Sequence, residues 1–449
     1  MLTTIPRRAL AFLAALMLAP AAPLAAQDAP APEVVFTNVR VFDGTADALS
    51  GPTTVVVRGN VIAAIGPQAA PASPAATVID GTGQTLMPGL IDAHVHMMFN
   101  SLSPAAMAAP DMSLEKIMQL SATQSRAMLL RGFTAVRDVG GPSFMLKKLI
   151  DNGTVMGPRI WPSGPMISQT SGHADLRGPD EPSRRFSGRM SKAEEVWASV
   201  IADGRDEVLT AVRENLRMGA SQIKIAAGGG TSSEYDPLDV TQYTLDEMKA
   251  AVDAASDWNT YVTVHAYHPK SVRRAIEAGV KVIEHGNLLD EDTLRLMAEK
   301  GIWLSGQMLV DSTEAMDPKR REKRKPVIEG QRLVWPMAKR LGVKLAWGTD
   351  FLFDPELNAQ QNAYILRLKP YFAPAELLKL VTSGNAELLA LSGPRTPYEG
   401  RLGVVAQGAL ADLILVRGDP LADIDLIGNP DANFSVIMKD GVIVKGPGQ

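Results

Sequence analysis

Met87-Pro-Gly-Leu-Ile-Asp-Ala-His94-Val-His96 is the most telling segment of this chain. It begins as an apolar run typical of a buried strand and ends in two histidines separated by one residue. Positions i and i+2 of a strand point to the same face, so both imidazoles can approach one metal ion. Imidazole is a common ligand of zinc and neighbouring transition metals. The pair alone is a weak signal, and its weight comes from the rest of the chain.

Four further residues that can bind a metal or react stand at or near the ends of other β-like runs. They are Lys224 in SQIKIA, His265 in YVTVHAY, His285 in KVIEHG and Asp350 in KLAWGTD. In a (β/α)8 barrel, catalytic residues come from the carboxyl ends of several different strands. The pattern therefore predicts one site assembled from many strand ends.

Strand-like and helix-like segments alternate along most of the chain. Strands are expected at 86–96, 133–139, 159–167, 221–227, 261–267, 281–285, 303–309 and 344–349. Helices are expected around 113–131, 143–152, 192–218, 244–258, 270–279, 290–300, 327–341 and 374–391. Alternation favours a parallel sheet, and eight repeats favour its closure. The fold class predicted for residues 87–401 is therefore α/β, a (β/α)8 TIM barrel.

The two ends of the chain predict a second, smaller unit. Residues 33–86 and 402–449 contain short β-like runs, and the runs VVVRGNVIAAI and VIMKDGVIV look like equivalent hairpins. Their Gly-Asn and Asp-Gly dipeptides supply the positive-φ residues that a tight hairpin needs. We expect the two ends to form a small β-sandwich domain together.

From about residue 33 onward, the chain resembles the metal-dependent amidohydrolase superfamily. The resemblance rests on PGLIDAHVH (88–96), GFTAVRD (132–138), SGHAD (171–175), IKIAAGGG (223–230), VHAY (264–267), IEHG (283–286) and GTD (348–350). Lys224 and the SGHAD segment are similar to the prolidase-like and imidazolonepropionase-like branch, whose members cleave Xaa-Pro or Xaa-Arg/Lys dipeptides and N-acyl amino acids. That branch also includes ochratoxin-hydrolysing amidohydrolases. Two departures, GHAD in place of GHGD and the loop GGGTSSEYD, lie where substrate would bind.

The resemblance implies two divalent metal ions, with zinc as the default and manganese, cobalt or iron as alternatives. His94, His96 and Asp350 would bind the first ion. His265 and His285 would bind the second.

Lys224 would join the two metals by the same resemblance. A protonated ammonium offers no lone pair to a cation. The family solution is carboxylation by CO₂, which gives a carbamate whose oxygens bridge both ions. The alternative for Lys224 is a salt-bridged lysine at the mouth of the barrel.

The implied reaction is hydrolysis of a C–N bond by metal-activated hydroxide. Asp350 is the carboxylate best placed to take the proton of the attacking water and pass it to the leaving nitrogen. A serine nucleophile is the competing idea, but the chain has no GxSxG segment.

Substrate contacts are predicted at two further positions. By resemblance, His173 and Tyr267 would hold the terminal carboxylate of the substrate. A loop histidine bonded to backbone and a tyrosine packed at the barrel mouth are the alternatives. Gly228-Gly-Gly230 is expected to let the backbone approach the site, or to form a flexible loop. His268, beside Pro269, is expected to be a surface or capping residue.

Two charged segments have structural interpretations. Arg137-Asp138 is expected to be an ion pair that supports the barrel end. The basic run Lys319-Arg-Arg-Glu-Lys-Arg-Lys325 is expected to be a solvated loop or helix start. The other interpretation of this run is a rim that attracts anionic substrates.

The N-terminus has the sequence pattern of a targeting segment. Arg7 and Arg8 precede an apolar stretch from Ala9 to Met17, followed by small residues to about Ala26. This order is typical of a signal peptide over residues 1–26, so we expect a periplasmic or secreted protein, with a retained membrane anchor as the alternative. The chain has no cysteine, which excludes disulfides and lipoprotein anchoring. A net charge of −4 gives no argument for nucleic-acid binding.

Three functional hypotheses follow. The first is a binuclear metallohydrolase acting on dipeptides or N-acyl amino acids. The second keeps the metal site but acts on a cyclic, imidazolone-type amide or on a xenobiotic amide such as ochratoxin. The third is a non-catalytic secreted binding protein, which the presence of all the site residues argues against. No interface is readable in the sequence, so a homo-oligomer is left open.

Overall fold

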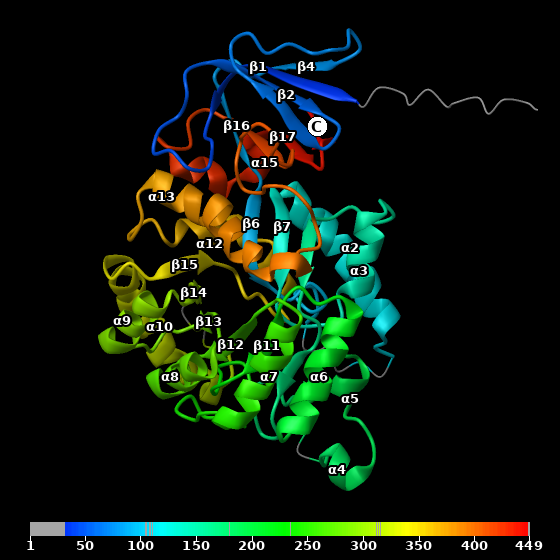
Figure 1. The fold of residues 1–449 in the computed structure, drawn as a ribbon, viewed down its shortest axis with the longest axis vertical. Coiled ribbons are helices and arrows are strands. Elements are labelled where there is room, and N and C mark those ends of the chain that lie inside the picture. The colour runs from blue at the N-terminus through cyan, green and yellow to red at the C-terminus, as the bar shows by residue number, and fades with distance from the viewer. Residues whose placement is uncertain are drawn as a thin grey trace, which may run out of the picture.

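The computed structural model describes residues 32–447 except 104, 105, 107, 108, 110, 179, 234, 311, 313 and 315. A sheet built mostly of antiparallel strands lies at one end of the molecule, and parallel strands with helices around them form the rest (Figure 1). The predicted α/β class is confirmed. Residues 1–26 lie outside the described part, so the signal peptide stays a prediction. Within residues 32–447 as described, no helix is both long and apolar enough to cross a bilayer.

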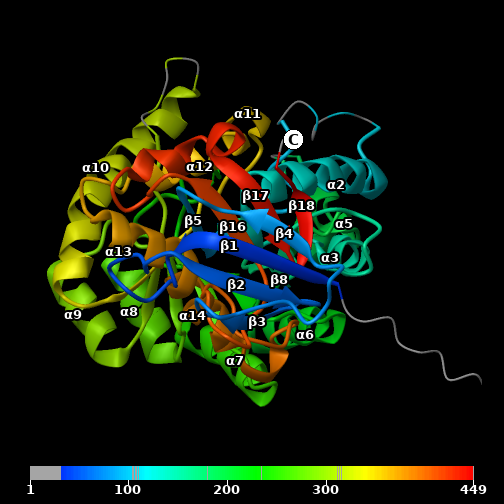
Figure 2. The ribbon, with the colours of Figure 1, turned by 90° about the horizontal axis from the view of Figure 1, so that it is seen from above.

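Strands from both ends of the chain share the first sheet. Its members are β1 (Glu33–Val41), β2 (Thr53–Arg58), β3 (Val61–Ile65), β4 (Thr77–Asp80), β5 (Gln84–Pro88), β16 (Leu413–Arg417), β17 (Phe434–Lys439) and β18 (Val442–Lys445). The order is β18-β17-β16-β5-β1-β2-β3, and β4 pairs with β1. Antiparallel pairing of β5 with β16 joins the N-terminal strands to the C-terminal ones. Seen from above, this terminal sheet lies over the helix-ringed part (Figure 2).

The predicted tight hairpins are confirmed. Gly59 and Asn60 connect β2 to β3, and Asp440 and Gly441 connect β17 to β18. Gly59, Asp440 and Gly441 all have positive φ angles, as such turns require. The two turns touch, because Asn60 Nδ2 donates to Asp440 Oδ1 at 3.2 Å.

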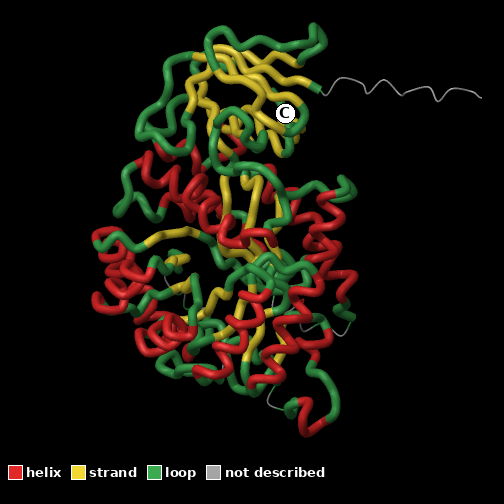
Figure 3. The backbone as a smooth tube through the Cα atoms, viewed as in Figure 1, coloured by secondary structure: helices red, strands yellow, loops and turns green. Residues whose placement is uncertain are grey.

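The parallel strands fall into two hydrogen-bonded groups. Figure 3 shows strands in yellow inside this part of the molecule, with red helices on the outside. The first is β6 (Leu90–Val95), β7 (Phe133–Asp138) and β8 (Arg159–Pro162). The second runs in the order β10 (Ser199–Ile201), β9 (Met166–Ser168), β11 (Ile223–Ala226), β12 (Val262–Ala266), β13 (Val282–His285), β14 (Trp303–Gly306) and β15 (Lys344–Trp347).

Backbone hydrogen bonds connect both edges of the first group, β6 and β8, to the second group. Asp350 N, beyond β15, donates to His94 O on β6 at 2.8 Å. Ser221 N, before β11, donates to Pro162 O at the end of β8 at 2.7 Å. The carboxyl ends of β6 and β15 therefore lie side by side, which places His94 beside Asp350.

Two predicted strands are each split in two. The expected strand 86–96 is wrong as a single element, because β5 belongs to the terminal sheet and β6 to the parallel strands. The chain changes sheets at Pro88-Gly89, where proline has no N–H to offer and Gly89 N donates to Asp412 O at 2.8 Å. The expected strand 159–167 is likewise interrupted between β8 and β9.

The longer helices follow the parallel strands. They are α2 (Leu114–Leu130), α3 (Phe144–Asp151), α6 (Arg205–Met218), α7 (Leu245–Asp257), α8 (Pro269–Ala278), α9 (Glu291–Lys300) and α10 (Pro318–Arg340). Shorter helices are α4 (Arg184–Ser187), α5 (Lys192–Glu195), α11 (Pro355–Asn358), α12 (Gln361–Leu366), α13 (Pro374–Lys379), α14 (Asn385–Leu389) and α15 (Pro430–Asn433).

Three predicted helices differ from the structure. The expected helix 192–218 is α5, then β10, then α6, with Gly204 at the N-cap of α6. The expected helix 374–391 is interrupted by a π-helical turn, Leu380–Gly384. Helix α10 begins nine residues before the expected 327, because Asp317 caps its N-terminus and Pro318 occupies its first turn. The basic run 319–325 therefore forms the start of this helix, as predicted.

An arginine on β8 connects the terminal sheet to the parallel strands. Arg159 Nε donates to Asp412 Oδ2 at 2.8 Å, and its Nη2 donates to Asp440 Oδ1 at 2.6 Å. Arg159 and Asp412 are buried. The contact fixes the hairpin turn at Asp440 against the α/β part.

Candidate active site

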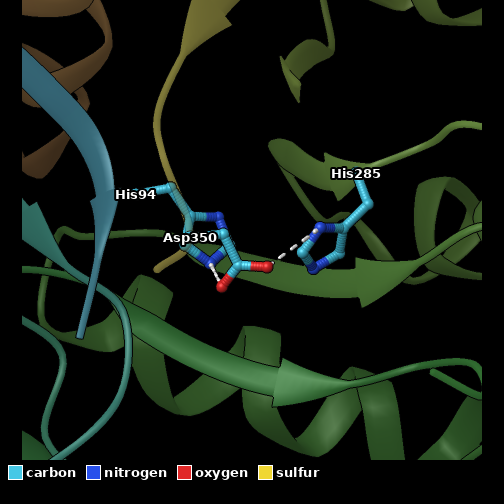
Figure 4. A group of neighbouring side chains, drawn as sticks. All are labelled: His94, His285 and Asp350. Carbon is cyan, nitrogen blue, oxygen red and sulfur yellow. Dashed lines mark ion pairs between the residues drawn. The ribbon is translucent and has the colours of Figure 1, made fainter. Parts of the chain in front are cut away.

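Three predicted ligands, all histidines, approach the carboxylate of a fourth, Asp350. His94 Nε2 and His96 Nε2 each lie 3.1 Å from Asp350 Oδ1, and His285 Nδ1 lies 3.8 Å from Asp350 Oδ2. Figure 4 shows Asp350 between His94 and His285. Ligand atoms of these three residues lie within 4.8 Å of one another, close enough to hold one metal ion. Although burial favours the neutral acid, the adjacent histidines hold the pKa of Asp350 well below its usual value.

The other predicted site residues adjoin this cluster. The ring of His265 lies 4.4 Å from that of His285 and 5.1 Å from that of Tyr267, centroid to centroid. His173 stacks on His265 with 3.7 Å between centroids. The structure therefore brings together all the predicted site histidines and Tyr267. His268 stays apart and caps α8 by accepting from Lys270 N, as predicted.

Lys224 is buried on β11 beside the same groups. Its side chain is among the largest that the protein buries completely. Burial lowers the pKa of Lys224 to about 8, although Glu284 and Asp350 oppose this shift. With a pKa of about 8, about a tenth of the amine is neutral at pH 7 and has a lone pair.

Each of three histidines has one ring nitrogen held by the protein. His94 Nδ1 lies 2.7 Å from Glu284 Oε2, His96 Nδ1 lies 3.2 Å from Gly140 O, and His265 Nε2 lies 3.1 Å from Gly229 O. When one nitrogen donates to such an acceptor, the other is a lone pair available to a metal. This arrangement is typical of metal-binding histidines.

Glu284 and Arg137 form a buried ion pair beneath the cluster that the sequence did not predict. Arg137 Nη2 donates to Glu284 Oε1 at 2.6 Å, and both side chains are fully buried. Burial favours the neutral acid, but Arg137 and His94 hold the pKa of Glu284 well below its usual value. The expected Arg137–Asp138 pair is wrong, because Arg137 turns to Glu284 across the strands. Two charged residues inside apolar strand-like runs were the available signal, since buried charges need partners.

Asp236 is a second residue that the sequence did not single out. Its Oδ2 lies 3.1 Å from His173 Nδ1 and accepts from Gly230 N at 2.8 Å. Lys323, on α10, donates to the backbone oxygens of Ser233 and Asp236 at 2.8 and 2.9 Å. The loop after β11 therefore holds His173 in place from one side.

Strained backbone marks two of the predicted ligands. His285 has a φ of 73° and Asp350 a φ of 53°, values that non-glycine residues rarely adopt. On β13, Glu284 already faces inward, so an ordinary strand would turn His285 outward. The positive φ lets both side chains reach the site. Such strain persists where the surrounding structure enforces it, often at functional sites.

Two glycines permit close approaches at the site. A Cβ on Gly348 would lie 2.4 Å from His94 N, and one on Gly230 would lie 2.1 Å from the His173 ring. The predicted approach of the glycine loop to the site is confirmed at Gly230. Gly348 explains why the segment GTD can bring Asp350 next to β6.

Comparison with known proteins identifies the family. The amidohydrolase family matches residues 85–446. The chain belongs to this family. The ochratoxinase of Aspergillus niger is 31% identical to this amidohydrolase over 378 residues, which is 81% of this chain and 76% of that protein. A crystal structure of a prolidase complexed with N-methylphosphonate-L-proline is 34% identical, with a TM-score of 0.84, and covers 92% of this chain and 100% of its own. A Xaa-Pro dipeptidase with bound methionine in its active site is 29% identical, with a TM-score of 0.80 and coverage of 92% and 100%.

These relatives confirm the superfamily and its prolidase-like branch. This amidohydrolase is a hydrolase that acts on C–N amide bonds. The family generally uses divalent metals, and the cluster around Asp350 offers a candidate site for one. The relatives act on small-molecule dipeptide or amide substrates.

Proposed function

We propose that this amidohydrolase is a binuclear metal-dependent hydrolase that cleaves the amide bond of dipeptides or N-acyl amino acids. One observation carries the proposal: His94, His96 and His285 approach a single carboxylate, Asp350, with Lys224 and His265 close by. Amide-hydrolysing relatives of the prolidase type support the substrate class.

The residues present fit divalent transition metals, with zinc as our first choice. Neutral imidazoles and a carboxylate are the donors that such ions prefer. His94, His96 and Asp350 would hold one ion, and His265 and His285 the other. Acceptors on the second nitrogens of His94, His96 and His265 support this assignment.

Lys224 would link the two ions as a carbamate. The neutral amine is the form that reacts with CO₂, and the lowered pKa of Lys224 supplies it near neutral pH. Within the described residues, no carboxylate lies within ion-pair distance of its ammonium group, which argues against the salt-bridged alternative.

Asp350 would transfer the proton in this reaction. When bound, the metals would lower the pKa of an attacking water and polarise the scissile carbonyl. Asp350 is 22% exposed at its side chain, so solvent reaches its carboxylate. It would take the proton from water and deliver it to the leaving nitrogen.

The fold that would carry this chemistry is a closed (β/α)8 barrel with a terminal β-sandwich. Hydrogen bonds between the two groups of parallel strands, at His94 and at Pro162, support closure. The apolar residues shared by β1, β2, β5, β16 and β17 support a sandwich core. We also propose export by the segment 1–26, on its sequence pattern alone.

A xenobiotic amide is the second candidate substrate. The 31% identity to ochratoxinase over most of the chain favours it. Ochratoxin is itself an N-acylated phenylalanine, so one metal site could serve both substrate classes.

The test combines metal content with activity. Purified protein, reconstituted with zinc and bicarbonate, is expected to hold two equivalents of metal and to cleave members of a dipeptide and N-acyl amino acid panel. Lys224→Ala should lose at least about 10³-fold in kcat, and added short carboxylic acids should restore part of the loss by replacing the missing carbamate. Lys270→Ala, on exposed α8 surface, is the matched control. A protein that binds no zinc and cleaves nothing would refute the proposal.

A further inference from the structure

Arg324, on α10, has a buried guanidinium that has no ionic partner among the described residues. The residue is only 7% exposed. Its Nη2 donates to Val310 O at 2.9 Å, while Nε is buried with no hydrogen-bond acceptor. Among the described residues, no carboxylate lies within 4 Å of its nitrogens. An isolated buried charge of this kind is costly, so its presence needs an explanation.

The surroundings of Arg324 connect it to the site. The carbonyl that accepts from Arg324, Val310 O, lies three residues after Gln307, whose Nε2 lies 3.1 Å from His94 Nδ1. Burial and the neighbouring Arg320 lower the pKa of Arg324, while Tyr267, Tyr364 and Asp350 oppose that shift. Tyr364 packs edge-on against Phe351, the residue after Asp350, at 4.6 Å between centroids. The Tyr364 hydroxyl is also buried without a partner. The helices that carry these two unsatisfied donors therefore pack against the segments that follow β14 and β15, on the side of the site.

The backbone around Arg324 is held in place. Gln331, two turns further along α10, accepts from Leu309 N at 2.8 Å and donates to Leu309 O at 3.0 Å. Lys323 attaches the preceding position to the loop after β11. Arg324 is thus fixed from both sides, as a binding residue should be.

His173 is less free to take the same role. Its Nδ1 already contacts Ser233 Oγ at 2.7 Å and Asp236 Oδ2 at 3.1 Å, and its ring stacks on His265. The carboxylate-binding role predicted for His173 by resemblance therefore leaves room for a second, stronger receptor.

We propose that Arg324, with the Tyr364 hydroxyl, binds the carboxylate of the substrate. This inference rests on the proposed function and deepens it, because it requires the substrate to be an anionic amide rather than a neutral one. A guanidinium pairs with a carboxylate through two parallel hydrogen bonds, which satisfies the free Nε. The basic start of α10 then contributes one specific contact and not only a general attraction.

The test compares matched substrates in the zinc-loaded protein. An N-acyl amino acid and its C-terminal primary amide differ only in the charge that Arg324 would bind. Arg324→Met should lower kcat/KM for the acid about 10- to 100-fold, as expected for a lost charged hydrogen bond, and change that for the amide less than about threefold. Arg213→Met removes the same charge from an exposed position on α6, outside the basic run, and should leave both rates unchanged.

A binding measurement keeps this test independent of turnover. Calorimetry with N-acetyl-L-leucine and with its carboxamide should show the acid binding more tightly, and Arg324→Met should remove the difference. Equal losses on acid and amide, or unchanged discrimination in Arg324→Met, would overturn the proposal. If the wild type binds the acid through Arg324 but cleaves no panel member, the hydrolase proposal fails while the anion site stands.

Discussion

Two buried arginines organise different regions of this molecule, and their surroundings differ in one respect. Arg159 pairs with Asp412 and Asp440 between the terminal sheet and the parallel strands. Arg137 pairs with Glu284 beneath the site, and the second oxygen of Glu284 holds His94. In the first network the carboxylates hold only backbone and turns, whereas in the second a carboxylate also orients a predicted metal ligand. Stability and chemistry are therefore separable at Arg159 and coupled at Glu284.

Glu284→Gln should give the largest effect, because it breaks the coupled network. Arg137 would keep a buried charge without its counterion, which typically destabilises by about 3–5 kcal/mol. Glutamine keeps only one acceptor oxygen for the donors of His94 and Arg137, so the weaker hold on His94 should lower metal affinity about 10- to 100-fold. Urea denaturation of the metal-free protein and zinc titration would measure the two effects. Glu299→Gln, at an exposed position on α9, is the control.

Arg159→Met tests the network between the terminal sheet and the parallel strands. It leaves Asp412 buried and unpaired, so the free energy of unfolding should fall by about 3 kcal/mol. Activity of the folded protein should stay within about twofold of wild type, because the network contacts no predicted ligand. A large change in kcat/KM at a temperature where the variant is folded would show that the two regions are coupled after all.

Asp138 tests the site region through pH. Burial raises its pKa to about 7, and its Oδ2 has no hydrogen-bond partner. Between pH 3.8 and 7 the folded protein holds a proton that the unfolded chain has released, so this group lowers the free energy of unfolding as pH rises. Asp138→Asn should remove that contribution, and its advantage over wild type should grow from pH 4 to pH 7. Denaturation curves at both pH values measure the difference, and a constant difference would contradict the assignment.

Asn60→Ala should give the smallest effect. It removes the exposed hydrogen bond between the two hairpin turns, and such surface changes usually stay within about 0.5 kcal/mol. Thermal unfolding compared with Arg159→Met would show whether Asp440 is held mainly by Arg159. If Asn60→Ala lowered stability as much as Arg159→Met, the contact between the turns would be a main contributor to the stability of the terminal sheet.

The sequence was sufficient for the features that are repeated locally. Apolar runs that end in polar residues predicted β6, β11, β12, β13 and β15. The Gly-Asn and Asp-Gly dipeptides predicted the two hairpin turns. The roles of Glu284 and Asp236 could not be predicted, because their partners, His94 and His173, are distant in the chain. The positive φ of His285 and Asp350 has no local signature, since tertiary contacts enforce it. Pro88 ended a strand that the apolar pattern had continued, because periodicity does not show a change of sheet.

Pairing of β5 with β16 has a consequence for biosynthesis. Thr85 Oγ1 donates to Gly418 O, 333 positions later, so the N-terminal strands acquire this neighbour only after β16 has been synthesised. Until then, the backbone edge of β5 that β16 will cover stays open on the ribosome, where unpaired strand edges invite aggregation. A nascent chain stalled before residue 413 would expose that edge only a few residues from His94.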